Sequence, residues 1–181
     1  RRRVVITGLG IVSPVGNTVE EAWQNILAGR SGIAHVTKFD ASTFPAQIAG
    51  EVKNFDITDY ISAKDARRMD TFIHFGMAAG IQAVRDAGLD KENAADLERV
   101  GVAIGSGIGG LPLIEETKEE YLAGGIRKVS PFFVPGSIIN MISGNLSIMF
   151  GFKGPNIAHV SACTTGTHSI GEASRIIEYG D

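Results

Sequence analysis

Cys163 is the only cysteine of the 181-residue chain, and it lies in the segment IAHVSACTTGTHSIGEASRIIEYGD, residues 157–181. The apolar run before it predicts a buried strand and the small residues after it predict a helix, so the thiol falls at a strand-to-helix turn. The free N–H groups and the dipole of a helix N-terminus favour the nucleophilic thiolate and can stabilise an oxyanion. A lone cysteine is also a common core residue, so residue type alone leaves both interpretations open.

Sequence spacing places no histidine beside this thiol. His168 follows Cys163 by five residues, which on a helix turns the two side chains about 140° apart. We therefore expect His168 to pack against or support the site and not to act as the base for the thiol. The remaining histidines are scattered and do not pair with the cysteine at metal-ligand spacing, so no metal site is predicted. They are His35, His74 and His159.

The segment AIGSGIGG places Gly105, Gly107 and Gly110 at the spacing G-x-G-x-x-G. In form this is a dinucleotide-binding fingerprint between a strand and a helix. No second strand ending in Asp or Glu follows about 20 residues later, and the similar segment TGLGIVS has Ser13 where the last glycine belongs. We therefore favour glycines that shape a turn over glycines that hold a phosphate, and we expect no cofactor.

Two basic clusters stand out in a chain whose net charge is −3. Charge alone favours two solvated faces, and a docking patch for an acidic partner is the functional alternative. The net charge argues against general nucleic-acid binding, and no run of 18 apolar residues is present to span a membrane. A single cysteine cannot form an internal disulfide, which fits a reducing cytoplasm. The basic residues of the two clusters are Lys64, Arg67, Arg68, Arg127 and Lys128.

Periodicity and glycine positions predict alternating strands and helices. Buried strands are expected over residues 3–10, 99–105 and 157–161, with a shorter strand near 47–52. Helices are expected over residues 18–29, 71–89, 111–125, 137–151 and 164–179. Capping-box spacing marks two helix starts, at Thr18 and Ser62, and the fourth long helix is expected to start at Ser137. This alternation is typical of an α/β protein with a parallel sheet covered on both faces.

The stretch SACTTGTHSIG, residues 161–171, resembles the nucleophile segment of the β-ketoacyl-[acyl-carrier-protein] synthases, the condensing enzymes of fatty-acid synthesis. The similarity continues through RRVVITGLGIVSPVGN, GSGIGGL, RKVSPFFVPGSIINM, GPN and SRIIEYGD, and it is closest to the synthase II branch. It implies a thiolase-like fold, an αβαβα layered sandwich of two related halves, and a homodimer. Residues 1–181 would be the N-terminal synthase domain, truncated before the C-terminal half.

The resemblance also implies roles for particular residues. Cys163 would be the acylated nucleophile, with its own N–H group in the oxyanion hole. Ile108 would line the acyl-chain pocket, and Phe133 would reach that pocket across the dimer interface. The two basic clusters match the surfaces that such synthases offer to acyl carrier protein, so docking of this acidic partner becomes the expected role of those residues.

The implied reaction is a decarboxylative condensation, in which malonyl-carrier protein extends the acyl group held on Cys163. In the family, two catalytic histidines, a lysine and a glycine-rich loop lie in the second half of the fold. None of the four histidines here matches those positions. We therefore expect residues 1–181 alone to be inactive as a synthase, and poorly stable because apolar surfaces would be left uncovered.

Other classes fit the residues less well. The elbow of an α/β-hydrolase needs glycine two residues before and after the nucleophile, where this chain has Ser161 and Thr165. A non-catalytic partner subunit of the chain-length-factor type would lack the cysteine. The nearest alternative is another condensing enzyme, either a synthase I or a polyketide ketosynthase, because the acyl-chain preference is not readable from half a pocket.

Overall fold

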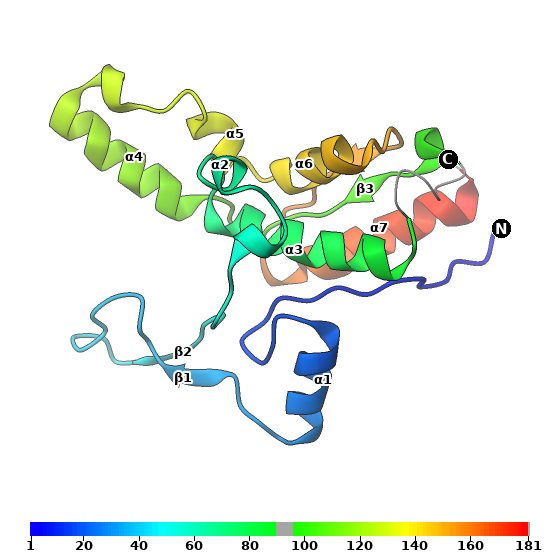
Figure 1. Cartoon of the computed structure of the whole chain (residues 1–181), viewed down its shortest axis with the longest axis horizontal. Helices are drawn as coiled ribbons and strands as arrows, with labels where there is room; N and C mark the ends of the chain where they lie inside the picture. Colours follow the sequence, from blue (N-terminus) through cyan, green and yellow to red (C-terminus); the bar gives the residue numbers. More distant parts are fainter. Residues whose placement is uncertain (90–95, 181) are drawn as a thin grey trace.

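The computed structural model describes residues 1–89 and 96–180; Asp181, the last residue of the SRIIEYGD segment, lies outside them (Figure 1). The described part is predominantly helical. Its α-helices are α1 (Val19–Leu27), α2 (Ala63–Ala66), α3 (Thr71–Asp86), α4 (Leu111–Gly124), α5 (Phe133–Ser137), α6 (Met141–Phe150) and α7 (Thr165–Tyr179). Its strands are β1 (Ile33–His35), β2 (Ile48–Gly50), β3 (Val102–Ala103) and β4 (Asn156–Ile157). Its 3₁₀ turns are η1 (Ile57–Asp59), η2 (Leu97–Arg99), η3 (Ile126–Lys128) and η4 (Ala162–Thr164).

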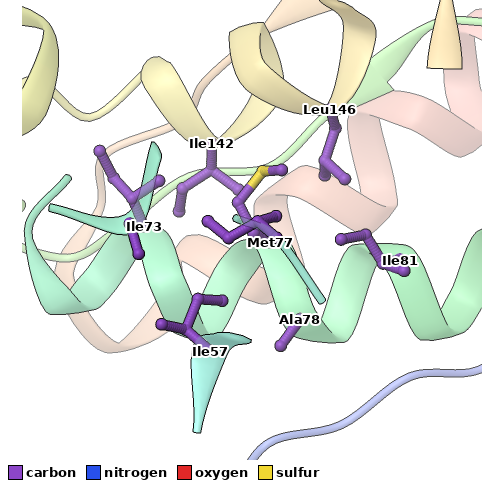
Figure 2. Close-up of a cluster of buried hydrophobic side chains, with 9 residues drawn as sticks. Ile57, Ile73, Met77, Ala78, Ile81, Ile142 and Leu146 are labelled. Atoms are coloured by element: carbon purple, nitrogen blue, oxygen red, sulfur yellow. The ribbon is translucent and has the colours of Figure 1, made fainter. Parts of the chain in front are cut away.

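The core lies between α3 and α6. Four buried residues of α3 repeat at helical spacing on one face, and Figure 2 shows them directed toward α6 and the turn η1. Close approach of the two helices depends on Gly76 and Gly80, because a Cβ added at either position would lie 2.6 or 2.5 Å from a side chain of α6. The buried residues of α3 are Ile73, Met77, Ala78 and Ile81, and those facing them from α6 are Ile142 and Leu146.

The strands β3 and β4 form the predicted parallel pair, with Val102 opposite Asn156 and Ala103 opposite Ile157. Both α6 and α7 pack against β3. The hydroxyl of Ser143, a fully buried residue of α6, accepts a hydrogen bond from the Ile104 N–H at 3.0 Å. It also lies 2.9 Å from the Ile157 carbonyl oxygen, so one side chain ties the helix to both strands. The α/β prediction is confirmed.

The helix starts at Thr18 and Ser62 are confirmed. The Thr18 side chain accepts a hydrogen bond from the Glu21 N–H, and the Ser62 side chain accepts one from the Asp65 N–H. The short strand predicted near residues 47–52 is β2, which pairs antiparallel with β1. The helix predicted over 71–89 is α3, after which Gly88 adopts the left-handed conformation, with φ of 66°.

The strand predicted over residues 3–10 is wrong for this structure, in which residues 1–12 form no strand. Two main-chain N–H groups of residues 1–12 bond to α3 side chains instead: that of Leu9 to Asp86 Oδ2 at 2.8 Å and that of Ile11 to Gln82 Oε1 at 3.2 Å. Ile6 is 81% exposed. A β-branched run becomes a strand only where a second strand pairs with it, and the described residues supply none here.

Two other boundaries are corrected. Of the strand predicted over residues 157–161, only Ile157 pairs, because β4 is Asn156–Ile157 and residues 158–161 leave the ladder toward η4. Ser137 ends α5 and does not start the next helix, because its hydroxyl donates back to the Val134 carbonyl and Ile138 is extended, with ψ of 143°. The helix α6 starts after Asn140, and Gly151 ends it in the left-handed conformation as predicted.

Candidate active site

Cys163 lies where the sequence predicts it, in the 3₁₀ turn η4 that leads directly into α7. Its side chain is exposed, so the interpretation as a small core residue is wrong. Among the described residues, the Cys163 main-chain N–H makes no hydrogen bond within the turn, where the bonds run from Thr164 N–H to Ser161 O and from Thr165 N–H to Ala162 O. A free thiol and a free N–H group therefore occupy the same residue.

The turn before Cys163 has an unusual backbone. Ala162 has φ of 53°, the left-handed region that residues with a Cβ rarely adopt. Thr165, a buried residue of α7, holds this turn with its hydroxyl. Thr165 Oγ1 accepts from the Ser161 N–H at 2.9 Å and donates to the Ala162 carbonyl at 2.8 Å. The sequence analysis identified neither residue, because no sequence pattern marks an alanine with a positive φ angle or the threonine that holds it.

His168 is directed to Ser161 and not to Cys163. Its Nδ1 lies 2.6 Å from Ser161 Oγ in a hydrogen bond. This contact agrees with the expectation that His168 is not the base for the thiol, and the residue is exposed and not packed in the interior. None of the described histidines is hydrogen-bonded to the cysteine, and no cluster of metal-ligating side chains occurs within residues 1–89 and 96–180.

The glycine segment of residues 105–110 packs against the turn that holds Cys163. A Cβ on Gly105 would overlap the His159 carbonyl oxygen and lie 2.7 Å from the Thr165 methyl group. A Cβ on Gly107 would lie 3.3 Å from the Ala162 carbonyl oxygen. Main chain therefore fills the space beside these two glycines, which supports the turn-shaping interpretation over a phosphate-binding loop.

Ile108 projects from this segment and is 75% exposed. It borders an open hollow of about 410 Å³, whose wall ends at Val160, three residues before Cys163. Phe133 begins α5, is half-buried, and does not line this hollow. The other lining residues are Ser137, Ile138, Ile139, Asn140 and Ala158.

The two basic clusters lie at opposite ends of α4. The first adjoins the start of this helix, since Asp70, two residues beyond Arg68, accepts a hydrogen bond from the Leu113 N–H at 2.8 Å. The second follows the end of α4 in the turn η3, and the 14-residue helix separates them by about 21 Å. Figure 1 shows α4 running outward from the body of the molecule.

The basic side chains are exposed except for Arg68, which is half-buried. The Arg68 guanidinium lies 4.2 Å from the centre of the Phe132 ring and 4.0 Å from the Asp65 carboxylate. Its charge is therefore partly engaged inside the chain. Lys64, Arg67, Arg127 and Lys128 present theirs to solvent.

Two of the solved structures similar to this chain are a ketosynthase/chain length factor and a beta-ketoacyl synthase. The chain matches the ishigamide ketosynthase/chain length factor with a TM-score of 0.83 at 30% identity, covering 99% of this chain and 45% of that chain. It also matches a beta-ketoacyl synthase from Burkholderia phymatum, with a TM-score of 0.82 at 27% identity and coverage of 99% and 44%. The fold is thus that of the N-terminal half of a thiolase-like ketosynthase.

The family model of the beta-ketoacyl synthase N-terminal domain matches residues 1–181, and the chain belongs to this family. It is 61% identical to 3-oxoacyl-[acyl-carrier-protein] synthase 2 of Vibrio harveyi over 183 residues, which cover 100% of this chain and 43% of the relative. The enzyme of the same name from Coxiella burnetii is 55% identical, with coverage of 100% and 44%. The chain thus spans less than half the length of these curated relatives.

No helix in the described residues has both the length and the apolar character needed to cross a membrane.

Proposed function

We propose that the protein containing this domain is a 3-oxoacyl-[acyl-carrier-protein] synthase of the synthase II type, with Cys163 as its nucleophile. One observation carries this assignment. The only cysteine of the chain is exposed in the turn before α7, and its N–H group makes no hydrogen bond within residues 1–89 and 96–180, in a domain 61% identical to a synthase of that name. A thiol that attacks a thioester needs exposure and a donor for the oxyanion, and this turn supplies both.

The proposed reaction has two stages. The Cys163 thiolate attacks the carbonyl carbon of an acyl-carrier thioester, the new S–C bond forms, and the carrier thiolate leaves and is protonated. Malonyl-carrier protein then loses CO₂, and the electron pair of the broken C–C bond attacks the acyl carbonyl. The Cys163–acyl bond breaks, which releases a 3-oxoacyl thioester two carbons longer and regenerates the thiolate.

A polyketide ketosynthase is the second candidate within the same chemistry, because one structural neighbour, at 26% identity, is the ketosynthase of a type II polyketide system. Curated relatives at 50–61% identity are 3-oxoacyl-[acyl-carrier-protein] synthases 2. The higher identity favours fatty-acid elongation. We further propose a homodimer in the cytoplasm in which Phe133 of one subunit reaches the acyl pocket of the other, with Ile108 at the wall of that pocket.

The proposed partner is acyl carrier protein, bound through Lys64, Arg67, Arg68, Arg127 and Lys128. One neighbouring structure is a type II polyketide acyl-carrier protein in complex with its ketosynthase. Separation of the two clusters by α4 suggests that the acidic partner contacts both ends of this helix, or one cluster on each subunit of a dimer. Exposure of the side chains supports long-range attraction, which weakens as salt screens the charges.

Intact mass measured on the full-length protein tests the nucleophile. After incubation with a long-chain acyl-carrier protein, we expect one acyl adduct on the peptide containing Cys163 and none in Cys163→Ala. Residues 1–181 alone should release no CO₂ from malonyl-carrier protein. Acylation that persists in Cys163→Ala, or synthase turnover by residues 1–181 alone, would overturn the proposal.

Charge reversal tests the docking surface. Arg127→Glu should raise the KM for acyl-carrier protein about tenfold at low salt while leaving the rate with a small acyl thioester unchanged. Lys118→Glu is the matched control, because Lys118 lies on α4 among four glutamates and outside both clusters. Equal effects of the two substitutions would remove the basis for the assigned surface.

A further inference from the structure

We infer that the hydroxyl of Thr165 is a positioning group for the oxyanion donor, a role that rests on the proposed function. The carbonyl of Ala162 and the N–H of Cys163 belong to one peptide unit, which is planar and trans. In such a unit the C=O and N–H bonds point in opposite directions. Whatever fixes the Ala162 carbonyl therefore also aims the Cys163 N–H.

Two donors hold that carbonyl from the side of α7. Thr165 Oγ1 donates to it at 2.8 Å, and the Thr165 main-chain N–H donates to it as well. The Cys163 N–H is consequently directed away from α7, which matches its lack of a hydrogen bond among the described residues. This is the orientation that a donor to an external oxyanion requires.

The same hydroxyl stabilises the unfavourable backbone that this orientation needs. Ala162 has φ of 53°, a conformation that persists only where the surroundings determine it. Thr165 Oγ1 accepts from the Ser161 N–H at 2.9 Å, so it binds the residues on both sides of that φ angle. Thr164 Oγ1 donates to the Ser161 carbonyl at 2.7 Å, and His168 is bonded to the Ser161 side chain.

Burial makes the hydroxyl difficult to replace. Thr165 is 5% exposed, and its methyl group packs against Gly105. Water therefore has little access to the two main-chain groups that bond to the hydroxyl. An isosteric valine would leave the Ser161 N–H without its acceptor and would remove one of the two hydrogen bonds to the Ala162 carbonyl. We expect the peptide between Ala162 and Cys163 to rotate in that variant, which moves the donor off the oxyanion.

The test compares Thr165→Val with Thr165→Ser in the full-length protein. Valine keeps the shape and removes the hydroxyl, whereas serine keeps the hydroxyl. We expect Thr165→Val to slow acyl transfer from acyl-carrier protein to Cys163 by about 10- to 100-fold, the range that a misplacement near 1 Å can cause. Thr165→Ser should stay within about threefold of the parent, and the KM for acyl-carrier protein should change little in both variants.

Alkylation by iodoacetamide separates positioning from general damage, because this reaction needs an accessible thiol and no oxyanion donor. Its rate at Cys163, followed by peptide mass, should remain within about threefold in Thr165→Val while acyl transfer falls. A proportional fall in both rates, or acyl transfer by Thr165→Val at the parent rate, would overturn the inference. If the parent protein itself fails to acylate Cys163, it is the proposed function that fails.

A second pair of variants covers the case in which valine at this buried position unfolds the protein. His168 is exposed, so His168→Ala is expected to fold, and it removes the bond to Ser161. His168→Asn retains a hydrogen-bonding atom near the place of Nδ1. We expect slower acyl transfer at an unchanged alkylation rate in His168→Ala and recovery in His168→Asn; equal acyl transfer in both would count against the inference.

Discussion

The Ser143 hydroxyl lies 2.9 Å from the carbonyl oxygen of Ile157, and the same hydroxyl accepts the Ile104 N–H at 3.0 Å. One side chain of α6 thus contacts the main chain where both strands of the parallel pair end, at the residue that follows β3 and at the last residue of β4. Ser143 is fully buried. We expect Ser143→Ala to lower the free energy of unfolding by about 1–3 kcal/mol, because buried main-chain groups lose a partner.

Chemical denaturation of the full-length protein measures this loss. Ser174→Ala is the matched control, since the Ser174 hydroxyl bonds within its own helix, to the Ile170 carbonyl at 2.7 Å, and to no other group in the described part of the chain. Alanine should leave stability within about 0.5 kcal/mol there. A Ser143→Ala variant as stable as the control would show that the hydroxyl is not needed to join α6 to the strands.

Asp70 joins the starts of two helices that are distant in the sequence. Its Oδ1 accepts from the Phe72 N–H at 3.3 Å in α3, and its Oδ2 accepts from the Leu113 N–H at 2.8 Å in α4. The residue is buried, so Asp70→Ala should cost about 1–3 kcal/mol through the unpaired N–H groups. Asp70→Asn keeps an acceptor oxygen and should cost less than alanine. Thermal unfolding of both variants checks this order.

Two opposing effects on stability are expected when Gly80 is replaced by alanine, and the larger of the two sets the sign of the change. Alanine within a helix gains about 0.5–1 kcal/mol over glycine. A Cβ at this position would lie 2.5 Å from a methyl carbon of Leu146, and overpacking of this kind costs about 1–3 kcal/mol. Gly80→Ala should therefore destabilise the protein. Gly144→Ala in α6 meets only ordinary contacts, at 3.5 Å, and should be neutral or stabilising. A gain in the free energy of unfolding from both substitutions would contradict the packing of α3 on α6.

Glu51 gives a prediction that depends on pH. Hydrogen bonds from the Thr37 side chain, at 2.7 Å, and from the Thr37 N–H hold the pKa of the Glu51 carboxyl below its ordinary value. A carboxyl with a lowered folded pKa contributes stability that is present above its unfolded pKa and is lost as the pH falls through the folded one. The β1–β2 hairpin should thus loosen in acid only below the ordinary range of glutamate, about 4.3.

Carboxyl titration by NMR measures that pKa directly. Thr37→Val should raise the pKa of Glu51, because it removes the first of these donors. Thr58→Val is the control: Thr58 lowers the pKa of Asp56 through its side-chain and main-chain bonds, so this variant should move Asp56 and leave Glu51 unchanged. An unmoved Glu51 pKa in Thr37→Val would refute the assigned cause.

The sequence predicted the parts of the fold that local chemistry determines. Capping side chains at Thr18 and Ser62, the end of a helix at Gly151 and the position of Cys163 before a helix all follow from short segments, and the structure confirms them. The strand over residues 3–10 failed, because pairing is a long-range property that a β-branched run does not specify by itself.

In the candidate site, too, features set by local sequence were predicted, and features set by contacts between segments were not. Cys163 could be found from its type and its place between strand and helix. The conformation of Ala162 and the hydroxyl of Thr165 that holds it could not, because they depend on atoms brought together by the turn itself. The glycines of residues 105–110 were expected not to bind a phosphate, but their close contact with the chain around the Cys163 turn, through Gly105 and the His159 carbonyl, required the structure.

The outward course of α4 has a consequence for how the domain opens. Thr117 is the buried residue of this 14-residue helix, whereas α3 buries four residues in the core. Amide protons of α4 should therefore exchange with solvent through local opening of a low-stability unit, while those of α3 exchange only when the whole domain unfolds. Local opening of α4 would then change the distance between the two basic clusters while the turn that carries the thiol stays folded.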